Sequence, residues 1–403
     1  MKKQKLNLLF GLYCLAVFLL ALGQFAVLSR GGESNVYLFD FGVAAFAAYG
    51  LAFFLIRRKF FIPRPFLFFG LFFGVATISL LKELTTLPTS DFIFSAFYLV
   101  RLGIYLLAAV VCFNAIEQKI INLASFLKVL FFAAFLLSVA GFVQLAILPD
   151  FTVLDPSLGW DPHKNRLAST FFDPNFMGGF LALSTGIAVG AALLKKLKFS
   201  VLEAFLYIGV PLLALFLTFS RSAWAAFAVV VFVLGVFRVR KLLFLGLFLA
   251  FLAYFAVPRV QTRISGITDP ADSAAFRLVS WKNSLEIAQD NLFLGVGYNA
   301  YRYAQKDYGF FEPGELGGNA GAGADSSLLF VLATTGILGL IPFLLGLTTS
   351  FVGMEERDWG IIILAVISGI ILQSQFINAL FYPQIMFFWL PLLALAATSR
   401  LRK

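Results

Sequence analysis

The sequence predicts an all-α polytopic membrane protein with about twelve transmembrane helices and a large extracytoplasmic loop containing short amphipathic helices. Hydrophobic residues make up 61% of the 403 residues and charged residues 13%, against roughly 45–50% and about 25% in soluble domains. Apolar runs of about 20 residues, enough to span a bilayer as a helix, recur along the chain. Soluble enzymes, disordered proteins and secreted disulfide scaffolds are therefore excluded, and such long runs exclude a transmembrane β-barrel.

Twelve apolar runs divide the chain, which we interpret as a single integral membrane domain over residues 1–403. The first run follows Lys2, Lys3 and Lys5 and is long enough to span, so it is interpreted as a retained signal anchor. The predicted spans lie at about 6–28, 36–56, 66–82, 92–114, 124–147, 175–195, 201–219, 223–237, 242–258, 325–348, 359–375 and 383–398.

Lysine and arginine residues predict the orientation. With a cytoplasmic N-terminus, eighteen fall in cytoplasmic segments and five in short external segments: Arg30, Lys82, Lys164, Arg166 and Arg221. Cytoplasmic loops carry this excess, and long loops are discounted. We therefore expect a protein of the cytoplasmic (inner) membrane with both termini cytoplasmic and the polar segments outside.

Two external segments, 148–174 and 259–324, are too long for simple connections. In the second, Ala275–Asp290 reads as an amphipathic helix that Asp272 or Ser273 can cap. Its apolar residues are Phe276, Val279, Leu285 and Ile287, interleaved with Arg277, Lys282, Asn283 and Glu286. The Gly-rich stretch GELGGNAGAGAD then leads into the tenth span and is interpreted as a flexible hinge or lid.

The formal charge of +10 favours membrane lipids as partners and not nucleic acid, because the basic residues sit beside apolar runs. Cys14 and Cys112 both fall inside predicted spans. His163 is the only histidine, so a histidine-based metal cluster is impossible. A solvated loop residue is the favoured interpretation of His163. No metal site and no cofactor are predicted.

Three arginines, Arg166, Arg221 and Arg277, gather on the external side from separate segments. Arg221, in TFSRSAW, must sit at or just below the headgroup level, where an unpaired cation is costly. A guanidinium there suits a phosphate because its planar donors bind in pairs and keep their charge. The alternative is an arginine whose side chain reaches to lipid phosphate.

Residues Lys164, Arg166 and Asn175 are candidate substrate-binding groups around a predicted helix start. Asp173 precedes a proline, which is typical of an N-cap followed by proline at the first helical position. A cap with a packing face is the alternative function of this segment. Arg101 lies mid-span, where structural pairing and a functional role are equally open.

Asp325 opens the tenth span in ADSSLLFVLATTGILG. An aspartate before an apolar run is a normal N-cap, and a carboxylate at this boundary can also accept a proton from a bound hydroxyl. No Walker loop, nucleophile elbow or carboxylate cluster with metal-ligand spacing is present. Three arginines and one carboxylate suit a substrate that carries a diphosphate on a membrane anchor.

Four segments within 160–345 resemble the O-antigen ligase and O-antigen polymerase superfamily of bacterial envelope enzymes. They are RLASTFFDPNFMGGFLAL, the Ser-Arg motif SRSAW, FRLVSWKNSLEIAQDNLFLGVGYNAY with its Trp and Gly-x-Gly, and Asp325 followed after ten residues by Gly336. The ligases carry histidine in place of Asp325, and leucine is usual where this chain has Ala225. Aspartate at this place is similar to polymerase-type members.

The resemblance implies a metal-independent, inverting glycosyl transfer from an undecaprenyl-diphosphate-linked glycan to a hydroxyl of a glycan or lipid acceptor. It implies catalytic roles for Arg221 and Arg277 at the donor diphosphate and for Asp325 as the base that takes the acceptor proton. A transporter or flippase of lipid-linked glycans is the alternative. Charges distributed through the spans would favour that alternative, yet only Arg101 and Lys128 were found well inside them.

Overall fold

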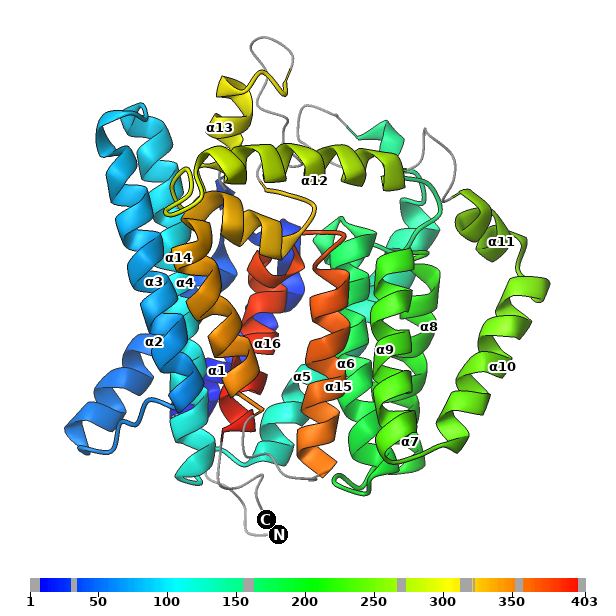
Figure 1. Cartoon of the computed structure of the whole chain (residues 1–403). Helices are drawn as coiled ribbons and strands as arrows, with labels where there is room; N and C mark the ends of the chain where they lie inside the picture. Colours follow the sequence, from blue (N-terminus) through cyan, green and yellow to red (C-terminus); the bar gives the residue numbers. More distant parts are fainter. Residues whose placement is uncertain are drawn as a thin grey trace.

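The computed structural model describes residues 8–29, 35–154, 163–266, 273–311, 321, 323–351 and 358–397 as a bundle of helices with two short antiparallel strands (Figure 1). Its first half contains α1 (Leu8–Leu22), η1 (Gly23–Ala26), β1 (Val27–Ser29), β2 (Val36–Tyr37), α2 (Leu38–Ile56), α3 (Arg64–Lys82), η2 (Glu83–Thr85), α4 (Thr89–Glu117), α5 (Leu123–Ile147), η3 (Phe151–Val153), η5 (Ser169–Phe171) and α6 (Pro174–Leu193). Its second half contains α7 (Val201–Ala204), η6 (Phe205–Gly209), α8 (Val210–Leu217), α9 (Arg221–Phe237), α10 (Lys241–Ala256), α11 (Pro258–Ser265), α12 (Ser273–Asp290), α13 (Tyr301–Asp307), α14 (Ser327–Thr349), α15 (Asp358–Gln373), η9 (Ala379–Phe381) and α16 (Pro383–Ala396).

Helical segments occupy all twelve predicted spans, and the polytopic membrane class is confirmed. Among the described residues, seven helices are long and apolar enough to cross a membrane, or eight if α10 and α11 form one bent span. Four shorter apolar helices occupy the remaining predicted spans: Val201–Leu217, Arg221–Phe237, Asp358–Gln373 and Pro383–Ala396. The number of twelve crossings stays a prediction.

The core of the bundle surrounds α16, which Figure 1 shows in red among the other helices. Every residue of α16 is buried, which is typical of a helix that is apolar on all sides. Its Phe387 ring meets Phe39 of α2 at 5.3 Å and Tyr105 of α4 at 6.1 Å between centroids, both edge to face. This packing joins the first third of the chain to its last helix.

Helix α10 occupies the predicted span at 242–258, and the chain bends into α11 where that span ends. The two helices meet at Val257 with a bend of 98°. Pro258 opens α11, because proline is preorganised for the first helical position but cannot continue a helix that precedes it. No residue of α10 is buried, and Figure 1 shows the helix at the edge of the bundle.

Helix α12 lies across one end of the bundle, hereafter the α12 end (Figure 1). The predicted helix at Ala275–Asp290 is confirmed and begins at Ser273, while Asp272 lies outside the described residues. Of its four apolar residues, Ile287 is buried, whereas Phe276, Val279 and Leu285 are exposed. Most of the Gly-rich stretch, residues 314–320 and 322, also lies outside the described residues.

Candidate active site at the α12 end

Three helices, α6, α9 and α14, begin at the α12 end, and each has a side chain that caps its first turn. Asp173 accepts from the backbone N–H groups of Asn175 and Phe176, Ser220 from Ala223, and Ser326 from Leu329. The predicted Asp173–Pro174 helix start is therefore confirmed. Helix N-termini carry partial positive charge and favour nearby anions.

The cap of α14 is Ser326, so the interpretation of Asp325 as the N-cap is wrong. Ser326 has extended backbone angles, φ −153° and ψ 125°, and its Oγ accepts from the Leu329 N–H at 3.3 Å. Asp325 precedes the cap. The possible role of Asp325 therefore depends on its contacts with α12 and on the cavity that it lines.

Asp325 and Arg277 are both held by α12. The Asp325 N–H donates to Ser280 Oγ at 3.0 Å, and Trp281 Nε1 donates to the Asp325 carbonyl at 3.1 Å. Arg277 lies three and four positions before these residues and so shares their helix face. Its Nε donates to the Phe376 carbonyl at 2.7 Å, just after α15. One helix therefore brings together two of the predicted catalytic residues.

Arg166 and Asn175, two predicted substrate-binding residues, are in direct contact. Arg166 donates from Nη2 to Asn175 Oδ1 at 3.0 Å and from Nε to the Thr218 carbonyl at 2.9 Å. Ser220, next to Arg221, donates to the same Asn175 oxygen at 2.9 Å. Asn175 thus links the segment before α6 to the Ser-Arg motif at the start of α9.

Arg221 and Lys164 contact the region around α11. Arg221 Nη1 donates to the Arg263 carbonyl at 3.0 Å, and Arg259 donates to the carbonyls of Asn165 and Lys164. The Lys164 ammonium lies 2.9 Å from Asp150 Oδ2. Hydrogen bonds from Thr152, and then from Lys164, lower the pKa of Asp150 to about 2. Lys164 therefore has a carboxylate partner within the protein.

A cavity of about 270 Å³ opens beside Asp325. Asp173 and Arg101 also line it, together with amides such as Asn378. The remaining wall is largely aromatic: Tyr37, Tyr98, Phe171, Phe172, Phe176, Tyr298, Phe330, Phe381 and Tyr382. The rings of Phe176 and Tyr382 stack with centroids 4.0 Å apart.

Arg101 is buried and paired, so the structural interpretation left open for it holds. Its Nη2 lies 2.7 Å from Asp40 Oδ2 and donates also to the Asn35 carbonyl at 2.5 Å, and Tyr105 donates to Asp40 Oδ1 at 2.9 Å. The sequence reasoning missed Asp40. A carboxylate near the start of the second predicted span was the available signal, because charges within a membrane usually pair with one another.

Two motif glycines meet at a break in α14. Gly336 has φ 62° and ψ −168°, and a Cβ on it would lie 2.2 Å from the Phe293 carbonyl group. A Cβ on Gly295, from the Gly-x-Gly motif, would lie 2.3 Å from the Thr334 carbonyl carbon. Only glycine permits this approach of two backbones.

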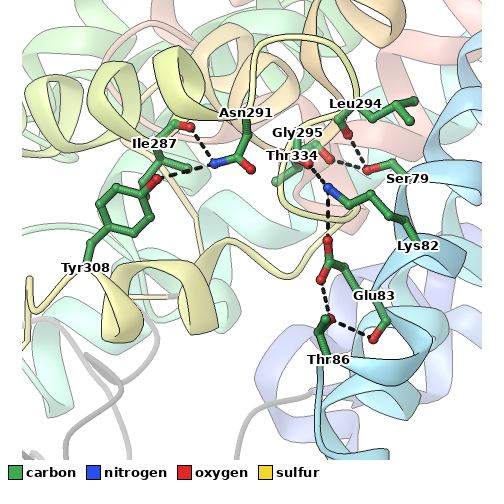
Figure 2. A network of polar contacts seen from close by, with 10 residues as sticks. All are labelled: Ser79, Lys82, Glu83, Thr86, Ile287, Asn291, Leu294, Gly295, Tyr308 and Thr334. Atoms are coloured by element: carbon green, nitrogen blue, oxygen red, sulfur yellow. Dashed lines mark hydrogen bonds and ion pairs between the residues drawn. The ribbon is translucent and has the colours of Figure 1, made fainter.

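Figure 2 shows the hydrogen bonds from α3 that stabilise the contact between the Gly295 segment and α14. Ser79 donates to the carbonyls of Leu294 and Thr334, and Lys82 donates to the Gly295 carbonyl at 2.7 Å. On the other side, Asn291 donates to the Ile287 carbonyl at 3.0 Å, which joins the segment to the end of α12. These contacts position α12, and with it Arg277, over the start of α14.

His163 is buried, with 7% of its surface exposed, and its ring centroid lies 4.2 Å from that of Phe151. The expectation of a solvated loop residue is wrong, because the segments at 148–154 and 163–171 pack together. Within the described part of the chain, no group of three or more histidine, cysteine, aspartate or glutamate residues could hold a metal ion.

The fold defines a polytopic helical membrane protein, with two groups of polar residues at the α12 end of its bundle: Arg277 and Asp325 at α12, and Arg166, Asn175 and Arg221 at the starts of α6 and α9. Residues 205–344 match the family model described as O-antigen ligase, which confirms the resemblance to the O-antigen ligase and polymerase superfamily. The matched segment includes Arg221, Arg277, Asp325 and Gly336. No curated protein matches the chain.

Proposed function

We propose that this protein is a glycosyltransferase of the O-antigen polymerase or ligase type. It moves an oligosaccharide from undecaprenyl diphosphate to an acceptor hydroxyl on the outer face of the cytoplasmic membrane. The observation that carries this function is the placement of Arg277 and Asp325 by one helix, α12, with Asp325 in the lining of a cavity. The family match supports the same chemistry.

The donor diphosphate binds at the arginines, with Arg221 and Arg277 in catalytic roles and Arg166, Lys164 and Asn175 in supporting ones. Guanidinium groups suit phosphate oxygens, and the N-termini of α6 and α9 add favourable partial charge. Arg221 donates from Nη1 to the Arg263 carbonyl, and a guanidinium can bond several acceptors at once because it has five N–H groups.

The acceptor oxygen attacks the anomeric carbon as the bond from that carbon to the diphosphate oxygen breaks, with inversion of configuration. Asp325 takes the proton from the acceptor hydroxyl, and the diphosphate leaves with the bonding electron pair. Charge grows on the leaving oxygen in the transition state, and preorganised cations stabilise charge that develops in this way. No metal ion is needed for these steps.

A gel assay of purified protein with a lipid-diphosphate oligosaccharide tests this function. Donor alone should yield a ladder of products if the enzyme is a polymerase. Donor with a separate acceptor should yield one discrete shift if it is a ligase. Unchanged donor in both reactions, with protein of normal thermal stability, would contradict glycosyl transfer and would favour the flippase alternative. No observation described above supports that alternative.

A further inference from the structure

Arg259 of α11 contacts the two chain segments that precede α6 and α9. Its Nη1 donates to the Asn165 carbonyl at 2.6 Å, and its Nη2 donates to the Lys164 carbonyl. Its Cζ atom lies 4.3 Å from the centroid of the Phe219 ring, which is a cation–π contact. One side chain therefore bridges two segments that are far apart in the sequence.

Two of the residues that Arg259 contacts have a left-handed backbone conformation. The φ angle is 52° at Asn165 and 47° at Phe219. Asparagine tolerates this region, whereas a bulky side chain there is a genuine outlier, and such conformations persist only where the surrounding structure holds them. Arg166 follows Asn165 directly, and Arg221 follows Phe219 by two residues. The placement of both arginines therefore depends on turns that Arg259 contacts.

Helix α11 buries little of its own surface. Val260 is its one buried residue, and no residue of α10 before it is buried. The Arg263 carbonyl of α11 accepts a hydrogen bond from Arg221 Nη1 at 3.0 Å. Arg259 and Arg263 are four residues apart, so they lie on one face of the helix. Polar contacts from this face therefore hold α11 against the start of α9.

We infer that Arg259 is a positioning residue for the donor site. It holds the turns at Asn165 and Phe219, and these turns direct Arg166 and Arg221 toward the diphosphate of the lipid-linked donor. The inference rests on the proposed function and adds a residue to the site of its first substrate. Arg259 acts through the two neighbouring arginines, because its own Nη groups donate to carbonyls of the protein.

Binding of undecaprenyl diphosphate to the purified protein in nanodiscs tests the inference independently of turnover. Arg259→Lys keeps the positive charge, but a single ammonium lacks the planar fork that bonds two carbonyls and stacks on a ring. Affinity should fall about tenfold, as for one lost charged hydrogen bond, while thermal stability stays near that of the parent. Phe219→Leu, which removes the ring beside the guanidinium, should also weaken binding.

Arg240→Lys is the matched control, because Arg240 is exposed and lies at the opposite end of α10. It should leave the affinity unchanged. Adding Arg259→Lys to Arg221→Lys should weaken binding little further, since residues that act through one network are not additive.

Parent-like binding by Arg259→Lys, or losses that add fully with Arg221→Lys, would overturn the positioning role. If Arg259→Lys does not fold, Phe219→Leu decides in the same way. No diphosphate binding by the parent would overturn both the donor site and this inference. Weakened binding in the variants of a parent that transfers no glycan would instead overturn the proposed function alone.

Discussion

Ser326 caps α14, which separates two roles that Asp325 could have combined. An aspartate that caps a helix is kept for stability, and its removal costs about 0.5–2 kcal/mol. An aspartate that takes a proton is kept for rate, and its removal typically costs about a hundredfold to ten-thousandfold. The two positions are adjacent, so each can be changed with the other intact.

We expect Asp325→Asn to reduce turnover of lipid-linked donor at least about a hundredfold while leaving thermal stability near that of the parent. The amide cannot take up the acceptor proton, and the cap at Ser326 is unaffected. Ser326→Ala is the matched control, which should lower the melting temperature and retain most activity. Turnover within a few-fold of the parent for Asp325→Asn would place the base elsewhere.

Arg221→Lys and Arg277→Lys should each lose most activity despite keeping their charge. Lysine offers a single ammonium and cannot present two parallel donors to a phosphate. Protein abundance should be near normal, because the guanidinium groups act on the donor. Full turnover by both lysine variants would reduce these arginines to lipid headgroup anchors.

Several candidate residues could be predicted from the sequence because polar residues are scarce in this apolar chain, and a polar residue in or beside a membrane span is usually functional or paired. Arg166, Asn175, Arg277 and Asp325 all lie at the α12 end. The burial of His163 could not be predicted, since it depends on Phe151, twelve residues away, folding back against it. The Arg101–Asp40 pair joins two separate helices: two opposite charges within predicted spans indicated that each needed a partner, but not that they would pair with each other.

Helix α14 is held at its break by the segment after α12. Val296 donates to the Ala333 carbonyl at 3.0 Å, while Ile337 and Leu338 donate to Leu292 and Phe293. The resemblance marked both glycines of this contact, yet the sequence alone predicted an unbroken span. Glycine can adopt many backbone conformations. The conformation of Gly336 therefore follows from the backbone that packs against it and could not be predicted from the glycine alone.

Gly336→Ala should destabilise the protein by more than about 1–3 kcal/mol, the usual range for a residue in a sparsely populated backbone region. The new Cβ would also lie 2.2 Å from the Phe293 carbonyl group. Gly74→Ala in α3 is the control, because its Cβ would meet nothing within 4 Å. Thermal unfolding in detergent measures both variants, and equal melting temperatures would contradict a required backbone approach.

The predicted span at 242–258 ends where α10 bends into α11, but the short helix α11 was not predicted, although Pro258 was the available signal for a helix start. Hydropathy continues smoothly through residues 242–258, so composition alone predicts one span. The number and approximate bounds of the apolar helices were predictable, because a bilayer admits few alternatives to a helix for such runs. Their bends, breaks and lateral neighbours depend on tertiary packing.

At the scale of the whole molecule, the two ends of the bundle carry different groups of charged residues. The α12 end holds the candidate site, while the opposite end holds an ion-pair cluster in which Lys196 and Arg238 contact Asp358 at 3.0 and 3.1 Å. The cavity at the α12 end is lined by residues as distant in sequence as Gln24 and Met386. It could not be predicted, because it exists only once the helices are assembled.

Single cysteines should establish which end faces outward. In a background with Cys14 and Cys112 changed to alanine, Glu286→Cys on α12 should react with an impermeant maleimide in intact cells. Lys198→Cys, at the opposite end, should react only after permeabilisation. The charge bias of the connecting segments supports this direction. The reverse labelling would move the candidate site to the cytoplasm.

The break in α14 also bears on the order of assembly during synthesis. Backbone groups exposed to lipid cost several kcal/mol each when unpaired, and here their partners are Ser79 and residues 292–296. All of these partners precede α14 in the chain and leave the ribosome first. Helix α14 is therefore synthesised after the backbone groups that pair with its break, and residues 292–296 can bind it as soon as it is inserted.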